Sequence, residues 1–401
     1  MRTTFCTRYF AVVLVLAASC WLGGCRGLDT GSPNPVGGGS GGLTKGEQLP
    51  PTASPVQRII VVILQNNTFD HLFGTFPAAN GFHPGVPGYT QTDANGNSVS
   101  PFLLTTTTPA NLPEGRAAYL KVWDNGLMDK FAASNGDQSM GYYDGTTPGV
   151  STLWSYAQQF ALADNYFSSV MSEAPTNQLY MVAAQDNGQV FPVQPDFGPC
   201  NKTDAASKPY SFPHVGDQLT GKSIDWEIFV ENYGQCGNFV PQHDPFQYFV
   251  DTNNTPRIQD YSQFAPQMAS ATLPAVSFVI PSPAHDMHPG GGSVLAAANW
   301  LNNFIQQIQN SSLWANTAIV ITWDTGGGWY DHVPPPQVDS QGLSFRVPLL
   351  VISPYAKKGY ISHVQMDHVS ILKFIQWNWN LGPLSVPRNN TSTDIRDMFQ
   401  F

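Results

Sequence analysis

The stretch from Ile59 to Gly74, IIVVILQNNTFDHLFG, decides the fold. Its first six residues are apolar and mostly β-branched, which predicts a short strand buried on both faces of a sheet. The apolar run then stops at amides, a hydroxyl, an Asp and a His. In α/β proteins, functional polar groups gather at the carboxyl ends of such strands. The stretch therefore predicts an α/β fold with a polar site where this strand ends.

Similar apolar runs recur along the chain, at 275–280 (AVSFVI), 318–322 (AIVIT) and 348–353 (PLLVIS). Between them lie segments with apolar residues at helical spacing, which predict helices at 294–311 and from His368 onward. Ser293 precedes the first of these helices and is a suitable N-cap. Strands that alternate with helices indicate an α/β sheet.

Two more of the predicted strands are followed by polar clusters, SPAHDMHPGGG at 282–292 and WDTGGGWYDHVPPP at 323–336. Asn, Asp, Gly and Pro often end strands for conformational reasons alone, so a single cluster would be explained as a turn. Three clusters that together hold four histidines and an acid favour one shared site. The residues are His71, His285, His288, Asp324 and His332.

The N-terminus has the pattern of an export signal. Arg2 and Arg8 precede the apolar run YFAVVLVLAASCWL, which is too short for a convincing membrane-spanning helix. The run ends in Leu22-Gly23-Gly24-Cys25, which resembles the bacterial lipobox, so we expect residues 1–24 to be a lipoprotein signal peptide and Cys25 to carry the lipid. Ordinary cleavage nearby without a lipid is the alternative.

Residues 25–55 are rich in Gly, Pro and Ser and predict a tether between the lipidated cysteine and the domain. No second linker of this kind follows, so residues 56–401 are predicted to form one domain. The expected location is the cell envelope, with the exported chain anchored to a membrane by its lipid. Arg26, rather than Asp, after Cys25 favours the outer membrane by analogy with lipoprotein sorting rules, although the face of the membrane stays open.

Composition limits the partners of the chain. Of 401 residues, 11% are charged and 42% hydrophobic, and the formal net charge is -10. The sequence has no basic cluster, which argues against nucleic acid as a partner, because phosphate neutralisation needs clustered Lys and Arg.

Five cysteines are present, and Cys200 and Cys236 are the two that lie beyond the signal and the lipid site. An even pair in an oxidising compartment predicts a disulfide, although sequence alone cannot show that the two meet.

Nine segments together resemble the bacterial phosphoesterase family that contains non-haemolytic phospholipases C and related acid phosphatases. They are QNNTFDHLFGTFP (65–77), DNGLMDKF (124–131), ALADNYFSSVM (161–171), NQLYMVAAQ (177–185), LPAVSFVIP (273–281), DMHPG (286–290), WDTGGGWYDHVPPP (323–336), FRVPLLVISPYAKKGYI (345–361) and DHVSILKFIQW (367–377). The resemblance spans most of residues 56–380. It implies an alkaline-phosphatase-like α/β/α sandwich with a central, mostly parallel sheet. It also implies phosphate-ester hydrolysis by a Ser or Thr nucleophile, usually with a divalent metal.

The metal ligands that the resemblance implies fall on Gln65, Asn66 and Asp324. Two departures weaken this set, because the family usually has an acid where this chain has Gln65 and a second acid where it has Thr325. Divalent ions with oxygen ligands depend on anionic charge. We therefore expect at most one divalent ion, which is weakly bound or absent.

The nucleophile of the family falls on Ala174, which has no hydroxyl. Thr176 and Ser172 lie two residues away and are the candidates to replace it, although both also suit the start of a helix. Glu173 could supply a missing carboxylate. His288 and His332 match family histidines and are candidate catalytic residues, with a structural role as the alternative for His332. A further family histidine falls near Glu114.

Function is left between hypotheses from different classes. The first is a phosphoesterase that hydrolyses a phospholipid or a small phosphate ester, as the overall resemblance implies. The second is a catalytically impaired relative that binds an anionic or phosphorylated envelope ligand or a protein, as Gln65, Ala174 and Thr325 suggest. A third is an envelope scaffold whose aromatic loops contact polysaccharide; the 10 Trp and 15 Tyr permit it but do not indicate it.

Overall fold

The computed structural model describes residues 50–188, 200 and 209–401, and residues 47–401 form one compact unit. The predictions for the signal peptide, Cys25 and nearly all of the tether lie outside the described residues. At the end of the predicted tether, Ala53 N–H donates to Asn378 O (2.8 Å) and Ser54 Oγ to Asn378 Oδ1 (2.6 Å), so these two residues contact the domain.

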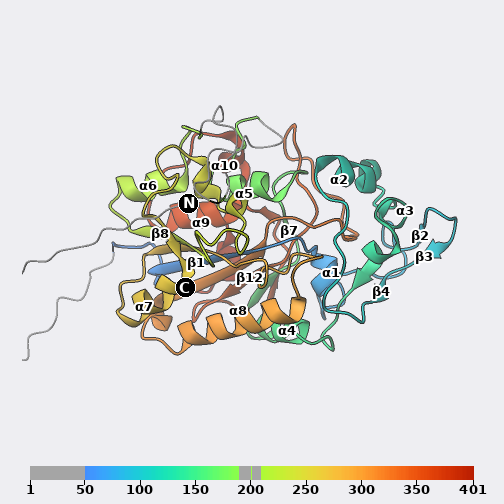
Figure 1. Ribbon diagram of the computed structural model, residues 1–401, viewed down its shortest axis with the longest axis horizontal. Coiled ribbons are helices and arrows are strands. Elements are labelled where there is room, and N and C mark those ends of the chain that lie inside the picture. Colours follow the sequence, from blue (N-terminus) through green and yellow to red (C-terminus); the bar gives the residue numbers. More distant parts are fainter. Residues whose placement is uncertain (1–49, 189–199, 201–208) are drawn as a thin grey trace, which may run out of the picture. The chain divides into compact units, whose positions relative to one another are not determined.

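An eight-stranded sheet forms the centre of this unit (Figure 1). Its strands, in spatial order, are β13 (Tyr360–Ser362), β6 (Ala161–Ala163), β12 (Leu349–Ile352), β11 (Thr317–Trp323), β1 (Arg58–Leu64), β10 (Val276–Ile280), β8 (Trp226–Val230) and β9 (Ile258–Asp260). All neighbouring pairs are parallel except those of β12, which runs antiparallel to both β11 and β6. The predicted α/β fold with a mostly parallel sheet is confirmed.

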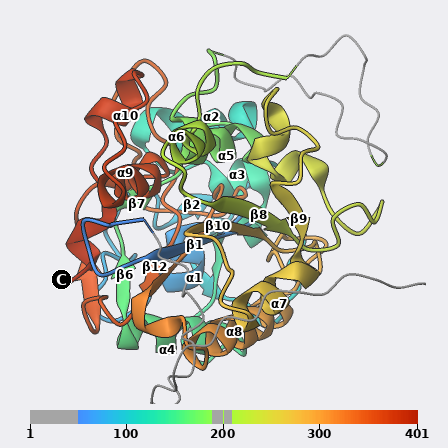
Figure 2. The same ribbon diagram turned by 90° about the vertical axis from the view of Figure 1, so that its left-hand side faces the viewer.

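Helices cover both faces of the sheet, so the unit is an α/β/α sandwich (Figures 1 and 2). On one face lie α5 (Ala174–Ala183), α6 (Val215–Gly221), α9 (Val369–Asn378) and α10 (Pro387–Thr391). On the other lie α4 (Val150–Gln159), α7 (Phe264–Ala269) and α8 (Val294–Gln309). Strand β1 is fully buried along its length, as its continuous apolar run predicts for a strand covered on both faces.

The remaining elements are short. They are α1 (Phe69–Phe73), α2 (Arg116–Trp123), α3 (Phe131–Asn135), the strand pairs β2 (Gln91–Thr92) with β3 (Ser98–Val99), β4 (Phe102–Leu103) with β5 (Gly141–Tyr142) and β7 (Tyr166–Phe167) with β14 (Met366–Asp367), and the 3₁₀ turns η1 (Asp124–Gly126), η2 (Asp137–Met140), η3 (Pro241–His243), η4 (Pro245–Tyr248), η5 (Tyr261–Gln263), η6 (Trp314–Asn316) and η7 (Ile395–Met398). Helices α2 and α3 lie beyond the end of the sheet where β1 leads into α1 (Figure 1).

Helix α8 shows how local sequence sets an element. Ser293 Oγ accepts a hydrogen bond from Ala296 N (3.3 Å), which caps the helix as predicted. The buried residues recur at helical spacing and pack against the sheet: Val294, Ala297, Ala298, Leu301, Phe304, Ile305 and Ile308. The prediction of a helix from residue 294 is confirmed, with the end at Gln309 two residues earlier than predicted.

Cys200 and Cys236, the predicted pair, are joined by a disulfide across a sequence separation of 36 residues. In the part of the chain that the structure describes, no helix combines the length and the apolar character that crossing a membrane requires.

Candidate functional site

The three strand-end clusters converge, as predicted, where β1, β10 and β11 end. Asn66 N–H donates to Asp324 Oδ1 (3.3 Å), and Asn66 Nδ2 lies 2.9 Å from His288 Nε2. Gln65 N–H donates to the carbonyl of Asp286 (2.8 Å). Strands β1, β10 and β11 are adjacent and parallel, so their carboxyl ends deliver these loops to one edge of the sheet.

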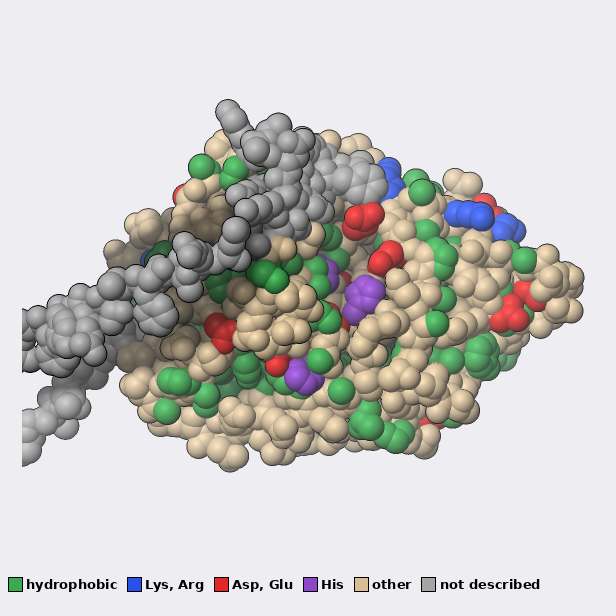
Figure 3. Space-filling view, in the orientation of Figure 1, with side chains coloured by type: hydrophobic (Ala, Val, Ile, Leu, Met, Phe, Trp, Pro, Cys, Tyr) green, Lys and Arg blue, Asp and Glu red, His purple; other side chains and the backbone are tan. Residues whose placement is uncertain are grey.

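A pocket of about 340 Å³ opens at this edge. It is lined by Gln65, Asn66, Glu114, Glu173, Ala174, Pro175, Val240, Gln242, His243 and His288. None of these lining residues carries a hydroxyl, a thiol or a permanent positive charge. On the face drawn in Figure 3, acidic and histidine side chains lie close together near the middle of the view.

Asn66 connects the residues around the pocket by hydrogen bonds. Its backbone has a positive φ of 58°, which Asn tolerates better than most residues and which turns the chain sharply after β1. The carboxamide uses all its groups: Nδ2 donates to Glu114 Oε2 (2.6 Å) and to His288 Nε2, while Oδ1 accepts from Thr325 Oγ1 (2.6 Å). The network sets the orientation of the amide, with its hydrogens toward Glu114 and His288.

The tautomer of His288 follows from its contacts. Nδ1 lies 2.7 Å from the carbonyl of Pro289, which can only accept, so Nδ1 carries the proton of a neutral ring. Nε2 then has a lone pair and accepts from Asn66. The side chain is 28% exposed, and Nε2 lies 3.9 Å from Glu114 Oε1. His288 is thus placed to accept or relay a proton at the pocket.

Helix α5 points its N-terminus at the pocket. Ala174 and Pro175, in its first turn, line the cavity, and the N-cap Glu173 makes no side-chain cap hydrogen bond. Burial, and then the charge of Glu114, raise the pKa of the Glu173 carboxyl. Burial and the neighbouring His288 lower the pKa of His243 to about 3, so this ring is neutral.

Asp324 lies beneath the pocket and is fully buried. Its Oδ1 accepts from Asn66 N, and its Oδ2 accepts from Gln178 Nε2 of α5 (3.0 Å). Burial raises the pKa of this carboxyl well above its usual range, since no cationic partner among the described residues offsets the lost solvation.

The two predicted replacement nucleophiles lie away from the cavity. Ser172 and Thr176 are both fully buried, and Ser172 Oγ donates to Thr176 Oγ1 (3.1 Å). Neither is among the residues that line the pocket. The catalytic assignment of these two hydroxyls stays a prediction, and the position in the first turn of α5 that faces the cavity is the methyl group of Ala174.

His332 lies outside the pocket, which favours the structural role that the sequence analysis kept as its alternative. Its Nδ1 bonds to Asp70 Oδ2 (2.7 Å), and the Arg346 guanidinium bonds to Asp70 Oδ1 (2.8 Å) and to Asp331 Oδ1 (2.9 Å). Asp70 and Asp331, His332 and Arg346 form a buried ion cluster outside the pocket. Burial alone would raise the pKa of Asp70, but Arg346 and His332 hold it below its usual value.

The other predicted histidines also have protein partners. His71 is buried, stacks on Trp329 with ring centroids 3.8 Å apart, and bonds through Nδ1 to the carbonyl of Gly141 (2.8 Å). His285 bonds through Nδ1 to Glu231 (2.9 Å). Of the histidines that the strand-end clusters supply, His288 is the one that lines the pocket.

Sequence reasoning missed three lining residues outright, Val240, Gln242 and His243, and gave too little weight to two others. His243 comes from η3, a turn with no strand-end pattern, so nothing in its sequence context signalled it. Glu114 was singled out only as the position of a family histidine, and Glu173 only as a spare carboxylate. Both acids lie at the start of a helix, which is the signal that could have identified them. Glu114 directly precedes Gly115, the N-cap of α2, and Glu173 is the N-cap of α5.

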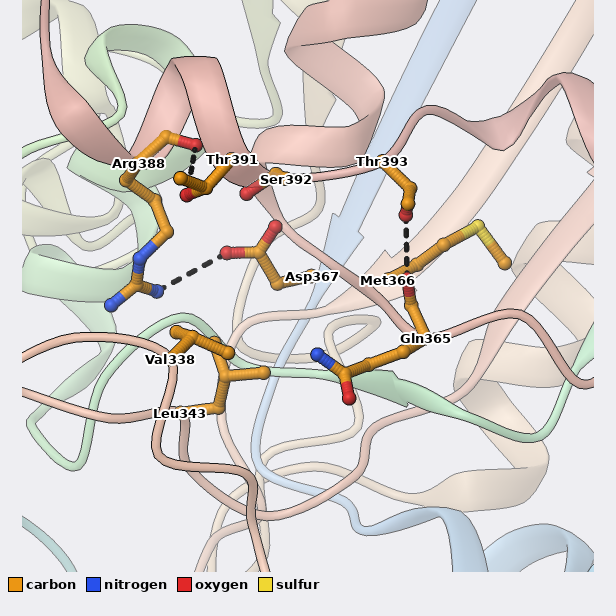
Figure 4. A pocket seen from close by; sticks show the side chains of 9 residues that line it. All are labelled: Val338, Leu343, Gln365, Met366, Asp367, Arg388, Thr391, Ser392 and Thr393. Atoms are coloured by element: carbon orange, nitrogen blue, oxygen red, sulfur yellow. Dashed lines mark hydrogen bonds and ion pairs between the residues drawn. The ribbon is translucent and has the colours of Figure 1, made fainter.

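A second cavity, of about 380 Å³, lies between α10 and the segment around Asp367 (Figure 4). Arg388 in its wall bonds to the carboxylates of Asp339 (2.7 Å) and Asp367 (3.2 Å) and to the carbonyls of Ser169 (2.7 Å) and Gly342 (3.1 Å). The guanidinium therefore donates its hydrogen bonds to acceptors within the protein. These bonds hold α10 against the rest of the domain.

The arrangement at the sheet edge is that of an α/β protein with a ligand pocket built from strand ends and a helix N-terminus. Residues 56–382 match the model of the Phosphoesterase family, so the chain belongs to that family. It is 25% identical over 414 residues to phospholipase C A of Mycobacterium tuberculosis, an alignment that covers 86% of this chain and 77% of the relative. It is 22% identical to the non-hemolytic phospholipase C of Pseudomonas aeruginosa, covering 86% of this chain and 57% of the relative.

Solved structures resemble the chain less closely. Murine ectonucleotide pyrophosphatase/phosphodiesterase 5 matches with a TM-score of 0.45 and 9% identity, covering 86% of this chain and 100% of the other. The lipoteichoic acid synthase LtaP from Listeria monocytogenes matches with a TM-score of 0.42 and 9% identity, covering 86% and 74%. These scores are too low to carry an argument about this chain.

Family membership implies a divalent cation at Gln65, Asn66 and Asp324, and these residues fit one poorly. Asn66 Oδ1 accepts from the Thr325 hydroxyl, and both oxygens of Asp324 accept N–H groups, so a cation would compete with these hydrogen bonds. Of the three residues, Asp324 is the one with an acidic side chain. Gln65 is neutral. Divalent ions with oxygen ligands need anionic oxygens free to bind them.

Two other groups of ligand-type atoms lie within 4.8 Å of one another in the described part of the chain, namely Asp70, Asp331 and His332, and His214, Asp217 and Asp251. In the first group, Arg346 already supplies the positive charge between the carboxylates. In the second, His214 Nδ1 accepts from Gly216 N–H (3.0 Å), so a neutral ring carries its proton on Nε2, which faces Asp251. That tautomer leaves Nε2 without a lone pair for a metal.

Proposed function

We propose that this protein hydrolyses a phosphate ester in the pocket at the carboxyl edge of the sheet. The observation that carries the proposal is the convergence of Asn66, His288 and the N-terminus of α5 on one cavity in a chain of the phosphoesterase family. Backbone N–H groups at a helix N-terminus attract a phosphoryl group. A histidine at the same cavity can move the proton that ester cleavage requires.

Water is the proposed nucleophile, because none of the residues that line the pocket carries a hydroxyl or a thiol. The water oxygen forms a bond to phosphorus as the bond from phosphorus to the ester oxygen breaks. The proton of the attacking water goes to Nε2 of His288, which then gives up its hydrogen bond from Asn66, or to the Glu173 carboxylate. The same group then gives this proton to the departing alkoxide. This single displacement differs from the two-step route through a side-chain hydroxyl.

Phosphodiesters of phospholipids are the first substrates to test, since the Mycobacterium and Pseudomonas relatives are phospholipases C. The purified full chain is assayed with a chromogenic phosphodiester, a chromogenic phosphomonoester and phosphatidylcholine. We expect turnover that His288→Ala lowers about 100-fold. His285→Ala, in the same loop but bonded to Glu231, is the matched control and should keep its activity. Equal activity in the wild type and in His288→Ala would contradict the proposal.

The absence of a covalent step has its own readout. Acid quenching during turnover of a radiolabelled substrate should leave no phosphate on the protein, and added alcohols should not compete with water as acceptors. A trapped phosphoprotein would show that a side chain attacks, and Thr176 and Ser172 would then be the residues to substitute.

A second candidate function is binding of an anionic or phosphorylated ligand without turnover. Gln65, Ala174 and Thr325 favour it, because each stands where the family places a group of the catalytic machinery. Ligand binding with no hydrolysis of any of the three substrates would establish this function in place of the first.

We also propose that the protein is exported and held at the envelope by a lipid on Cys25. The lipobox-like Leu22-Gly23-Gly24-Cys25 and the tether after it support this placement. Radiolabelled palmitate should enter the wild-type chain and not Cys25→Ala, and the variant should leave the membrane fraction. Equal labelling of both chains would contradict the anchor.

A further inference from the structure

The Gln65 side chain is the exceptional group of the pocket. It is fully buried, and neither Oε1 nor Nε2 has a hydrogen-bond partner among the described residues. It also lines the cavity. Leaving a buried amide unpaired costs about 1–3 kcal/mol, so such a group in a native site indicates a ligand that completes it.

The N-terminus of α5 opens onto the same cavity. The helix is ten residues long, and its N-cap Glu173 contributes no side-chain cap. A helix N-terminus carries partial positive charge and N–H groups directed at whatever lies before it. Pro175, the second residue of the helix, has no N–H, so Ala174 supplies the first helix amide beside the cavity, and its methyl group takes up little of the space there.

The carboxamide of Asn66 directs its N–H groups, not its oxygen, toward the pocket residues Glu114 and His288. Its Oδ1 is held by Thr325 Oγ1 at 2.6 Å, while Nδ2 is directed at Glu114 and His288. The Thr325 hydroxyl thus competes with a cation for this oxygen, and it supplies no negative charge that would hold a cation.

We propose that the pocket binds the phosphoryl group of its substrate directly, through the Gln65 amide and the N-terminus of α5, without a divalent cation. The inference rests on the proposed function for the identity of the ligand. Gln65 Nε2 donates to a phosphoryl oxygen, and the N–H groups at the helix start face another. Charge-assisted hydrogen bonds of this kind are about twice as strong as neutral ones.

The same chemistry selects the class of ester. Glu114 and Glu173 line the pocket, and no Lys or Arg does. Without a cation to offset these carboxylates, each additional negative charge on the ligand is unfavourable. The pocket should therefore favour a phosphodiester, with one charge, over a phosphomonoester, with two.

The test is calorimetric titration of the full chain with dimethyl phosphate and with inorganic phosphate, first in EDTA and then with added Ca²⁺ or Zn²⁺. We expect dimethyl phosphate to bind in EDTA, more tightly than inorganic phosphate, with little change on adding either metal. Gln65→Leu should weaken binding about tenfold or more, as expected for the loss of a hydrogen bond to a charged group. Gln365→Leu, an exposed glutamine of the second cavity, is the control and should bind like the wild type.

Gln65→Glu is the sharpest variant, because it changes shape little and restores the acid that the family carries. It should abolish binding of dimethyl phosphate in EDTA, since a carboxylate repels the anion, and make any binding depend on the added metal. Circular dichroism and thermal unfolding establish that each variant is folded.

The outcomes separate this inference from the proposed function. Binding in EDTA without turnover of any ester supports the inference and overturns the proposed hydrolysis. Turnover or binding that requires a metal in the wild type overturns the inference and leaves hydrolysis standing. No binding of either probe under any condition, or unaltered binding by Gln65→Leu, also overturns it.

Discussion

Two polar clusters arise from the same two stretches of sequence and differ in one respect. QNNTFDH supplies Gln65 and Asn66 to the pocket, and WDTGGGWYDHV supplies Asp324 and Thr325, which bond to Asn66 from beneath it. A few residues later the same stretches supply Asp70, Asp331 and His332 to the ion cluster around Arg346. In the ion cluster, Asp70 and Asp331 are both paired with the guanidinium. In the pocket, the buried amide of Gln65 has no partner among the described residues.

The difference separates a structural role from a functional one. A buried charge is tolerated when a partner offsets its lost solvation, and the ion cluster meets that condition within the protein. An unpaired buried amide lowers stability unless a ligand completes it. Residue type alone does not distinguish the two clusters, because both contain an Asp beside a strand end, but pairing does.

The largest effect should come from removing the cation of the ion cluster. Arg346→Met leaves Asp70 and Asp331 buried without their partner, and we expect a loss of about 3–5 kcal/mol in the free energy of unfolding. Arg257→Met breaks an exposed pair with Asp225 and should cost less than about 1 kcal/mol. Urea unfolding followed by circular dichroism measures both; equal losses would contradict the assignment of a structural role to the ion cluster.

The histidines of the two clusters should respond in opposite ways. His288→Ala should lower hydrolysis about 100-fold, because it removes the proton acceptor at the pocket, and change stability by less than about 0.5 kcal/mol. His332→Ala removes a hydrogen bond to the buried Asp70 and should destabilise the fold by about 1–3 kcal/mol. Steady-state kinetics and unfolding of both variants decide this. If His288→Ala were the less stable of the two, the comparison would be reversed.

Removing the unpaired amide should stabilise the protein, unlike any change in the ion cluster. Gln65→Leu replaces two buried polar atoms, which have no partner in the described part of the chain, with two methyl groups of similar size. We expect a gain of about 1–2 kcal/mol in the free energy of unfolding, together with the loss of ligand affinity described above. Thermal unfolding in the absence of phosphate is the measurement. A destabilised variant would indicate that Gln65 is paired in solution.

The smallest effect concerns the charge of the pocket. Burial and then Glu114 raise the pKa of Glu173, so its carboxyl gains a negative charge only as the pH rises through this raised value. Affinity for dimethyl phosphate should therefore fall severalfold as the pH rises above the range in which a glutamate carboxyl usually ionises. Glu173→Gln should flatten the profile and bind more tightly at the upper end. Titration across this range tests it, and an unchanged profile would remove Glu173 from the pocket's electrostatics.

Much of the fold could be predicted from local patterns. The apolar runs at 59–64, 275–280 and 318–322 correspond to β1, β10 and β11, and the segment from 294 to α8. The direction of β12 could not be predicted, because its run PLLVIS has the same apolar pattern whichever way the strand lies in the sheet. Direction depends on the long connection that precedes the strand, which periodicity does not describe.

The candidate site was partly predictable for a similar reason. Asn66, Asp324 and His288 follow strands that a parallel sheet brings to one edge, so position after a strand was enough to group them. The same rule also selected His332, which instead bonds directly to Asp70, beside Arg346, in the ion cluster. The rule did not select His243, because this residue reaches the pocket from the turn η3 and not from the end of a strand.

By itself the sequence determined the buried strands, the polar clusters at their ends, the family and the departures at Gln65, Ala174 and Thr325. These depend on the spacing of residues along the chain, which short-range sterics and hydrophobic burial translate into structure directly. Only the tertiary structure decided which polar groups are paired and which are left open. Thr325 meets Asn66 across 259 residues, and Arg346 meets Asp70 across 276. Such pairs form when the strands assemble into the sheet and bring distant loops together. The energy of a buried polar group therefore depends on its neighbours in space and not on its neighbours in sequence.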